Sequence, residues 1–396
     1  MLHQCHAQRR VLRGKPIINS RQLLEGKSND NPTNNRFLMT SYSGTQQSFA
    51  RPAEMLAGHN LGNGWTVGSV VTRSPSATGG KFSVGYKVNN IDGRIGFLKA
   101  IDLSEVLQAK DTMKAMQAVS EAYNFEVLIC KKCSNLKNVV SIFEHGEVAL
   151  SSGHPGINKV FYLLFESAEG DLREILDKES RHEDLIWKLR TLKNVASGIG
   201  QLHTSGITHQ DLKPSNVLGF PNNLFKIGDL GCSSSSGSNG PRDQFRIPGD
   251  TGYAAIELFY DPSKRQSFFD RCAADLYLLG SLIFFHFGGT SAKSALMSAK
   301  QKTPTVLTNN LELDLPIWKQ SFAYSLDDLG DTMGKNNVHK AIADGLLEIA
   351  AELCEPDPSR RGNRRRATAH PSQRLLALRY HGKFLHLERL AWIHGL

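Results

Sequence analysis

A group of polar residues between positions 209 and 229 constrains this chain more than any other feature. The run His209-Gln210-Asp211-Leu212-Lys213-Pro214-Ser215-Asn216 precedes the run Asp229-Leu230-Gly231. A carboxylate, a lysine two residues later and an asparagine five residues later can orient a hydroxyl, neutralise a moving phosphoryl group and hold a metal ion. The pattern therefore predicts two catalytic residues, Asp211 and Lys213, and two oxygen ligands for Mg²⁺, Asn216 and Asp229.

The pattern resembles the catalytic and metal-binding loops of protein kinases, and further stretches resemble other parts of that family in the same order. Lys99, within the apolar run 97–101, resembles the strand lysine that holds the α- and β-phosphates of ATP. Asp275 resembles the buried helix aspartate that braces the catalytic loop. The resemblance covers residues 61–362. It implies an α+β fold of two lobes, a small antiparallel-sheet N-lobe and a mainly helical C-lobe, with ATP between them.

A lysine in an apolar strand is costly unless it is paired, so Lys99 needs a carboxylate partner. The resemblance places that partner on the following helix. Glu126 fits best because it lies in the apolar stretch 125–129, and Glu121 and Glu105 are the alternatives. We therefore expect Lys99 and Glu126 to form an ion pair at the nucleotide site.

Other nucleotide contacts are expected from the hairpin after the first strand and from the connection between the lobes. Gly79 and Gly80 would let the backbone approach phosphates, although the chain has only two of the family's usual glycines there and a plain hairpin turn is the alternative. Val84 follows on the next strand. Glu166 and Ala168 fall where the family's adenine-binding hinge should be.

The stretch 249–257 resembles the end of a kinase activation segment, with Ile256 in place of the usual proline. Glu257 is expected to pair with Arg361. Gln210 stands where regulated kinases carry an arginine that binds a phosphorylated activation loop, so loop phosphorylation is expected to matter little here. Asp250 replaces the common threonine beside the catalytic loop. The serines from 233 to 236 are expected to be accessible, as in a flexible polar loop.

Composition divides the chain into three parts. Residues 1–60 are polar and predict a flexible extension; 61–362 form the predicted kinase-like domain, with an N-lobe over 61–166 and a C-lobe over 167–362. Residues 363–396 form a basic, partly helical tail. A helical pattern over 373–396 predicts packing on the larger lobe, with a docking helix for a partner as the alternative.

Hydrophobic spacing predicts the individual elements. Strands are predicted near 65–71, 82–88, 97–101, 139–143, 160–165, 217–218 and 225–227. Helices are predicted near 106–133, 185–202, 274–287 and 338–354.

The net charge of +9 is concentrated at the ends. Residues 1–60 carry eight basic and three acidic side chains, and residues 359–396 carry nine and one, which leaves the middle of the chain slightly acidic. A basic core for binding nucleic acid is therefore not indicated. The run from 360 to 366 could touch an acidic partner or lipid, although a solvated charge run is the simpler interpretation.

Six cysteines among 396 residues are too few for a disulfide scaffold, which favours a reducing compartment and a cytoplasmic location. Cys130 and Cys133 form one C-x-x-C pair without a second pair at zinc-site spacing. The longest apolar stretch, 276–288, is too short to span a bilayer and contains His286. We expect a buried helix there and no membrane span.

Taken together, the residues and the resemblance predict a serine/threonine protein kinase that uses ATP and Mg²⁺. The expected partners are ATP and a protein substrate with a serine or threonine acceptor. The lysine at position 213 carries the serine/threonine expectation, because tyrosine kinases usually place an arginine differently in that loop. Two other classes stay open: an inactive kinase-like scaffold, favoured by the irregular glycine loop, and a small-molecule kinase.

Overall fold

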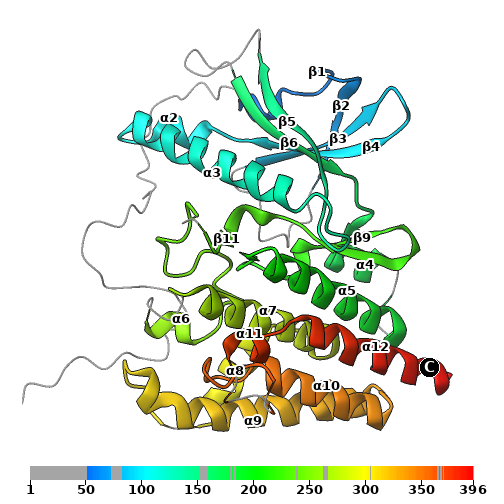
Figure 1. Ribbon diagram of the computed structural model, residues 1–396, viewed down its shortest axis with the longest axis vertical. Helices are drawn as coiled ribbons and strands as arrows, with labels where there is room; N and C mark the ends of the chain where they lie inside the picture. Colours follow the sequence, from blue (N-terminus) through cyan, green and yellow to red (C-terminus); the bar gives the residue numbers. More distant parts are fainter. Residues whose placement is uncertain are drawn as a thin grey trace, which may run out of the picture.

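The computed structural model describes residues 51–72, 83–150, 159–178, 181, 184–237, 240–261, 266–303, 305–363, 365, 368 and 370–395. These residues form two lobes, an upper lobe of strands with one long helix and a lower lobe of helices (Figure 1). The predicted fold class is therefore confirmed.

The N-lobe is built on a six-stranded antiparallel sheet in the order β1-β2-β3-β4-β6-β5. Its strands are β1 (Asn60–Gly62), β2 (Trp65–Val70), β3 (Ser83–Asn90), β4 (Ile95–Ile101), β5 (Ile142–Ala149) and β6 (Lys159–Glu166). In β4, Leu98 and Ala100 are fully buried while Lys99 faces the other side of the sheet. This alternation is the period of two that a half-buried strand requires.

The folded N-lobe begins before the predicted boundary at residue 61. A short 3₁₀ helix, η1 (Pro52–Glu54), places Ala53 and Leu56 in the core of the sheet with no exposed surface. The hydroxyl of Tyr86 donates a hydrogen bond of 2.7 Å to the carbonyl of Ala53. The sequence misled here because Ala53 and Leu56 lie in a short stretch that has no periodic apolar pattern.

The predicted single helix from 106 to 133 is two helices, α2 (Ser104–Gln108) and α3 (Thr112–Lys132). Ala109 is extended, and Asp111 caps the second helix by accepting a 2.9 Å hydrogen bond from the backbone of Lys114. An N-cap aspartate starts a helix rather than continuing one, which explains the break.

The strand predicted at 139–143 begins later, at Ile142. Val139 and Val140 are buried, but they contact the C-lobe instead of the N-lobe sheet. Val139 forms an isolated parallel bridge with Ile227, and the backbone N–H of Val140 donates to the carbonyl of Ile227 at 2.9 Å. This apolar pair therefore links the two lobes.

The C-lobe is mainly helical. Its helices are α4 (Leu172–Lys178), α5 (Leu185–Thr204), α6 (Glu257–Tyr260), α7 (Phe268–Gly288), α8 (Ala292–Gln301), α9 (Leu311–Lys335), α10 (Lys340–Leu353), α11 (Pro371–Arg374) and α12 (Leu378–Ile393). Its short strands are β7 (Gly170–Asp171), β8 (Ile207–Thr208), β9 (Val217–Phe220), β10 (Leu224–Ile227) and β11 (Ser234–Ser235). The sequence pattern predicted α5, α7 and α10 but not α8 or α9.

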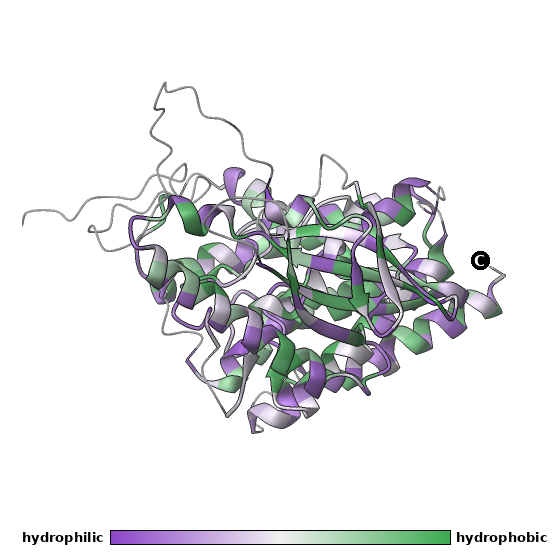
Figure 2. Cartoon of the chain, turned by 90° about the horizontal axis from the view of Figure 1, so that it is seen from above, coloured by the Kyte–Doolittle hydropathy of each residue, from purple (hydrophilic) through white to green (hydrophobic). Residues whose placement is uncertain are grey.

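Helix α7 is the centre of this lobe and packs against α5, α8, α9 and α10. Its residues from Cys272 to Phe284 are all buried, so it has no polar face toward solvent. Seen from above, the visible helices of the molecule mix hydrophilic and hydrophobic residues (Figure 2). A helix that is apolar all round belongs in the middle of a bundle.

The C-terminal tail packs on the larger lobe, as predicted. Helix α12 runs beside α5 (Figure 1) and buries Tyr380, Phe384 and Ala391. Close approach depends on Gly200, since a Cβ atom there would lie 2.5 Å from the side chain of Leu378. The tail therefore forms part of the hydrophobic core of the C-lobe.

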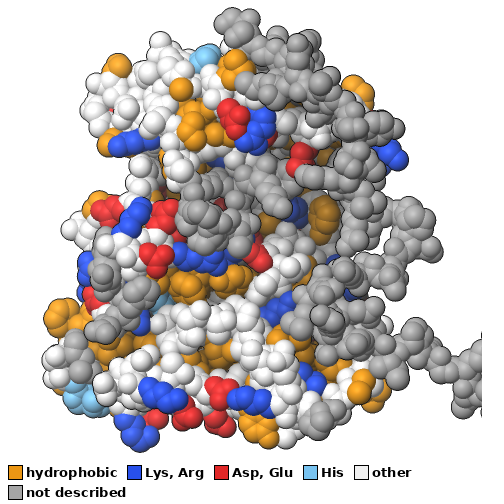
Figure 3. Space-filling view, turned by 180° about the vertical axis from the view of Figure 1, so that it is seen from behind, with side chains coloured by type: hydrophobic (Ala, Val, Ile, Leu, Met, Phe, Trp, Pro, Cys, Tyr) orange, Lys and Arg blue, Asp and Glu red, His pale blue; other side chains and the backbone are white. Residues whose placement is uncertain are grey.

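From behind, the outline of the molecule is notched between the lobes, and basic and acidic side chains lie side by side (Figure 3).

No single described helix has both the length and the apolarity of a membrane span. Helices α7 and α8 reach that length and apolarity only when they are taken together, and they are bent by 73° relative to each other. Cys130 lies in α3 and Cys133 caps it, both as buried free thiols.

Candidate active site

The predicted catalytic residues lie in the loop that joins β8 to β9. Asp211, Lys213 and Asn216 are each less than a tenth exposed. The side-chain amide of Asn216 donates to the carbonyl of Asp211 at 2.7 Å and to its carboxylate at 3.2 Å. These contacts within the loop help to fix the direction of the Asp211 side chain.

Asp275, at the centre of α7, holds this loop from below. Its carboxylate accepts hydrogen bonds from the backbone N–H groups of His209 at 2.8 Å and Gln210 at 2.7 Å, and lies 2.9 Å from Nε2 of His203. Gln210 needs such support because its φ of +64° is in the left-handed region that side chains rarely adopt. The predicted bracing role of Asp275 is confirmed.

Lys99 connects both lobes at the cleft. Its Nζ lies 2.7 Å from Oε1 of Glu126 on α3 and 3.0 Å from Oδ1 of Asp229. The predicted pairing with Glu126 is present, whereas Glu121 instead accepts a hydrogen bond from Gln117 on the outer face of α3. Three motifs from distant parts of the sequence therefore meet at one ammonium group.

The charges in this cluster favour an ammonium between two carboxylates. Burial disfavours the charge on Lys99, but Asp229 and Glu126 outweigh it and hold the pKa of Lys99 above its ordinary value. The same lysine holds the pKa of Asp229 well below its usual range. Asp229 is about half exposed, at 49%, so its carboxylate is both ionised and open to a ligand.

Backbone pairing brings the two motif runs together. Strands β9 and β10 are antiparallel, with Val217 opposite Ile227. The N–H of Gly228 donates to the carbonyl of Asn216 at 2.9 Å, and Nε2 of His209 lies 3.0 Å from the carbonyl of Gly228. The hairpin thereby places the predicted metal ligands, Asn216 and Asp229, at the ends of adjacent strands.

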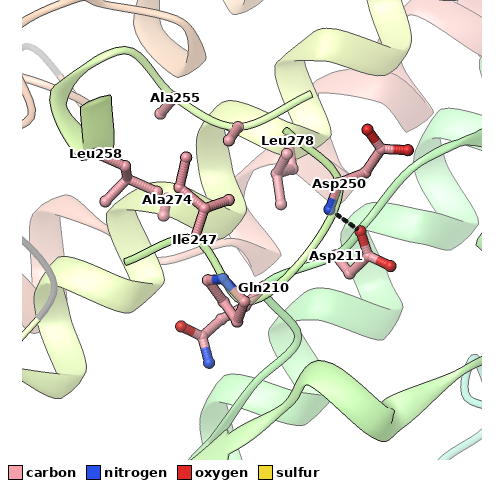
Figure 4. A pocket seen from close by; sticks show the side chains of 10 residues that line it. Gln210, Asp211, Ile247, Asp250, Ala255, Leu258, Ala274 and Leu278 are labelled. Carbon is pink, nitrogen blue, oxygen red and sulfur yellow. Dashed lines mark hydrogen bonds between the residues drawn. The ribbon is translucent and has the colours of Figure 1, made fainter. Parts of the chain in front are cut away.

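Asp250 contacts both of the residues that the sequence predicts to be catalytic. Its backbone N–H donates to Oδ1 of Asp211 at 2.7 Å (Figure 4), and its carboxylate lies 3.3 Å from Nζ of Lys213. Burial opposes the charge on Lys213, but Asp211 and Asp250 raise the pKa of its ammonium above 10.5. Burial also raises the pKa of Asp211, against the effect of Lys213. Lys213 is therefore a charged lysine that two carboxylates hold in place.

Gln210 contacts the activation segment through hydrogen bonds of its uncharged side chain. Its side-chain amide donates to Oγ of Ser234 at 2.8 Å, and that hydroxyl donates to Asp243 at 2.6 Å. Sequence reasoning missed Asp243; the Gly240-Pro241 pair marks a turn there but does not indicate which group the carboxylate reaches. The resulting chain of hydrogen bonds occupies the place where the family resemblance implied a phosphate-binding arginine.

The expected accessibility of the serine run is wrong for two of its members. Ser233 is 1% exposed and Ser234 is not exposed at all. Ser234 and Ser235 form β11, which pairs with β8 at the base of the catalytic loop. Backbone pairing draws these serines inward, and no hydrophobic pattern in the sequence signals it.

For the remaining predicted nucleotide-binding residues, the structure gives positions in the fold but no shared cluster of contacts. Val84 lies in β3 opposite Ala100, and Ala168 is half-buried after β6. The carboxylate of Glu166 is taken up by Lys226 at 2.7 Å and by the backbone of Ser141 at 2.7 Å, so only its main chain could serve a nucleotide. Gly79 and Gly80 lie outside the described residues.

The predicted pair of Glu257 and Arg361 is confirmed. Both side chains are buried, and two guanidinium nitrogens reach the carboxylate at 2.7 and 3.0 Å. The other donors of Arg361 reach the carbonyls of Glu355 and Ala273. This pair anchors the end of the activation segment to the C-lobe core.

The comparisons with known proteins agree with the fold. The model of the family described as "protein kinase domain" matches residues 78–372, ten residues beyond the boundary predicted at 362. Hormonally up-regulated neu tumor-associated kinase homolog A of Xenopus laevis is 26% identical over 260 residues, which are 61% of this chain and 32% of the relative.

Two further relatives carry serine/threonine kinase names. MAP kinase-interacting serine/threonine-protein kinase 1 of Xenopus tropicalis is 26% identical over 55% of this chain and 54% of its own length. Serine/threonine-protein kinase SSN3 of Scheffersomyces stipitis is 30% identical over 29% of this chain and 25% of its own. These matches span about half or less of each relative. The family match nevertheless covers most of this chain, which belongs to the protein kinase domain family.

Proposed function

We propose that this protein transfers the γ-phosphoryl group of ATP to serine or threonine hydroxyls of protein substrates. Asp211 accepts a hydrogen bond from the attacking hydroxyl and orients it. Lys213 and Lys99 place positive charge against the phosphates.

The observation that carries this proposal is the contact of Lys99 with both Glu126 and Asp229. It joins β4 to α3 in the N-lobe and to the end of β10 in the C-lobe, over sequence separations of 27 and 130 residues. An ammonium oriented from two sides and beside a half-exposed carboxylate is suited to phosphates that carry a metal ion. A scaffold that binds no nucleotide would have no need for that arrangement.

The donor set suits Mg²⁺. The amide nitrogen of Asn216 is bonded to Asp211, and among the described residues no donor occupies its Oδ1. That oxygen and the exposed carboxylate of Asp229 are hard ligands, and Mg²⁺ takes one or two protein carboxylates with phosphate oxygens and waters. Bound Mg²⁺ would neutralise charge that develops on the phosphates. Asn216 and Asp229 would hold it, while Asp211 remains free to orient the acceptor.

Serine/threonine preference is the more specific part of the proposal. It is supported by Lys213, two residues after Asp211, and by the names of two relatives. An assay of radiolabelled phosphate transfer should use three peptides that differ only at the acceptor, which is serine, threonine or tyrosine, and a set of small alcohols. We expect transfer to serine and threonine peptides and little to the others.

Substituting Asp211→Asn tests the catalytic assignment. The variant should lose turnover by at least about 10³-fold while it keeps ATP binding, because the side chain acts on the acceptor hydroxyl. Asp344→Asn, an exposed carboxylate on α10, is the matched control and should keep full activity. Unchanged turnover of Asp211→Asn would remove the assignment, and a parent protein that binds ATP but transfers nothing would favour the inactive scaffold.

A further inference from the structure

A cavity of about 580 Å³ opens on the C-lobe away from the candidate active site. Its walls are the outer face of α5, the turn between β9 and β10, the residues after α3, and α12. The lining residues that matter here are Lys137, Asn138, Arg190, Lys193, Asn222 and Asn223, and we call this cavity the basic groove. Its volume falls within the roughly 300–1,000 Å³ of ordinary ligand sites. None of the predicted nucleotide or catalytic residues that the structure describes lines it.

The basic groove carries an excess of positive charge. Lys137, Arg190 and Lys193 line it, and none of its described lining residues is an aspartate or a glutamate. Glu388 on α12, which is 4% exposed, supports Arg190 at 2.9 Å and contacts Lys193 from behind. One carboxylate thus balances two cations. Exposed Lys137 has no ion pair within the described part of the chain, so at least two positive charges remain for a ligand.

The floor of the groove is already ordered. The amide of Asn138 donates to Oδ1 of Asn194 at 2.8 Å, and the side-chain oxygen of Gln201 accepts from the backbone N–H of Asn138 at 3.0 Å. Asn138 is 4% exposed. A ligand would therefore find a formed surface, which reduces the ordering cost of binding.

The chemistry of the lining selects one kind of occupant. No phenylalanine, tyrosine or tryptophan is among the described lining residues, and His381 supplies the one aromatic ring there, so the run of aromatic side chains on which single-stranded nucleic acids stack is absent from the described walls. Asn222 and Asn223 place two side-chain amides at the rim, and amides both donate to and accept from peptide groups. Cations next to amides in a concave site suit a polypeptide with carboxylate side chains. We propose that the basic groove binds an acidic peptide segment of a partner protein.

The test uses a fluorescein-labelled hexaglutamate peptide as the probe and hexaglutamine as its uncharged counterpart. Fluorescence anisotropy should show binding of hexaglutamate to the full chain, weaker at 200 mM than at 50 mM salt. Lys137→Glu should weaken binding at least fivefold. Lys110→Glu, which makes the same charge change at an exposed turn before α3, should stay within twofold. A benzophenone-bearing hexaglutamate should crosslink to the stretches 131–140 and 221–224.

Arg190 and Lys193 are left intact because removing either would leave Glu388 buried with less compensation. Phosphate transfer to a short neutral peptide should be the same for Lys137→Glu and the parent, since the groove is separate from the cleft. Equal effects of the two lysine variants, equal binding of hexaglutamine, or crosslinks confined to the cleft would overturn the proposal. Tighter binding of an oligonucleotide than of hexaglutamate through Lys137 would also overturn it.

Discussion

Two ion-pair clusters in this protein use the same chemistry for different ends. In the cleft, Lys99 lies 2.7 Å from Glu126 and 3.0 Å from Asp229, and Asp229 is about half exposed. In the C-lobe, Arg361 lies 2.7 Å from Glu257, and neither has more than 2% of its side chain exposed. Distance therefore does not distinguish the two clusters, but exposure and the number of satisfied donors do.

The buried cluster is complete and the cleft cluster is open. Arg361 uses its guanidinium on Glu257 and on the carbonyls of Glu355 and Ala273, and it lies 5.1 Å from the ring of Tyr277. Lys99 has two carboxylates, one of them facing solvent. A closed cluster stabilises the fold, whereas an open one is prepared for a further ligand. Four substitutions can break or sharpen this distinction.

The largest effect is expected from Arg361→Met. The variant leaves Glu257 as an unpaired buried carboxylate, which typically costs about 3–5 kcal/mol of stability. Urea unfolding measures the loss. The double variant Glu257→Leu with Arg361→Met should recover part of it, because no buried charge is left. A loss below about 1 kcal/mol would mean that the closed cluster is not structural.

Lys99→Met should reduce activity more than stability, which is the reverse of the effect expected for Arg361→Met. We expect phosphate transfer to fall at least about 100-fold, which corresponds to about 2.7 kcal/mol of barrier. Stability should fall by less than half the loss in Arg361→Met, because the half-exposed Asp229 can turn to water and because burial already raises the pKa of Glu126, so that this carboxylate can take up a proton. Lys87→Met, on the exposed side of β3, is the control and should change neither quantity. A variant that unfolds as readily as Arg361→Met would erase the distinction between the clusters.

His286 on α7 is a third buried titratable group with which the two ion-pair clusters can be compared. It lies beside Trp187, and neither of its ring nitrogens is hydrogen-bonded among the described residues. Burial lowers its pKa from 6.5 to about 3. Between those values the unfolded chain binds the proton and the folded one does not, so stability falls as pH falls below 6.5, by about 1.4 kcal/mol per pH unit.

His286→Phe should therefore lose less stability than the parent when the pH drops from 7.5 to 5. The difference should be about 2 kcal/mol, from the 1.5 pH units below 6.5. Urea unfolding at the two pH values measures it, and the exposed His386→Gln should behave like the parent. Parallel losses in His286→Phe and the parent would contradict a neutral buried imidazole.

The smallest effect is expected from Asp250→Asn. Its carboxylate lies 3.3 Å from Lys213 and adds negative charge where phosphates are expected. The amide keeps the shape and the backbone contact with Asp211, so turnover should rise by up to about fivefold, or 1 kcal/mol. Steady-state kinetics at saturating ATP is the measurement. A drop in turnover would show that the carboxylate helps to position Lys213.

The sequence was sufficient for the fold class and for the contacts made by Lys99, Asp275 and Arg361. A charged residue in an apolar setting must find a partner, and the family resemblance limited the choices. Three features could not be predicted from the sequence: the first residues of the N-lobe, the break before α3 and the burial of Ser234. They depend on tertiary hydrogen bonds from Tyr86 and Gln210 and on a capping residue within a continuous helical pattern. The basic groove likewise combines residues after α3, on α5, in the β9–β10 turn and on α12, which only the tertiary fold brings together.

The packing of α12 on α5 also has a consequence during synthesis. Arg190 and its partner Glu388 are 198 residues apart, so ribosomes adding roughly 5–20 residues per second need roughly 10–40 s between them. During that time the outer face of α5, which includes Gly200, is exposed because α12 has not yet been synthesised. The nascent C-lobe should therefore be a client of chaperones until its last helix emerges.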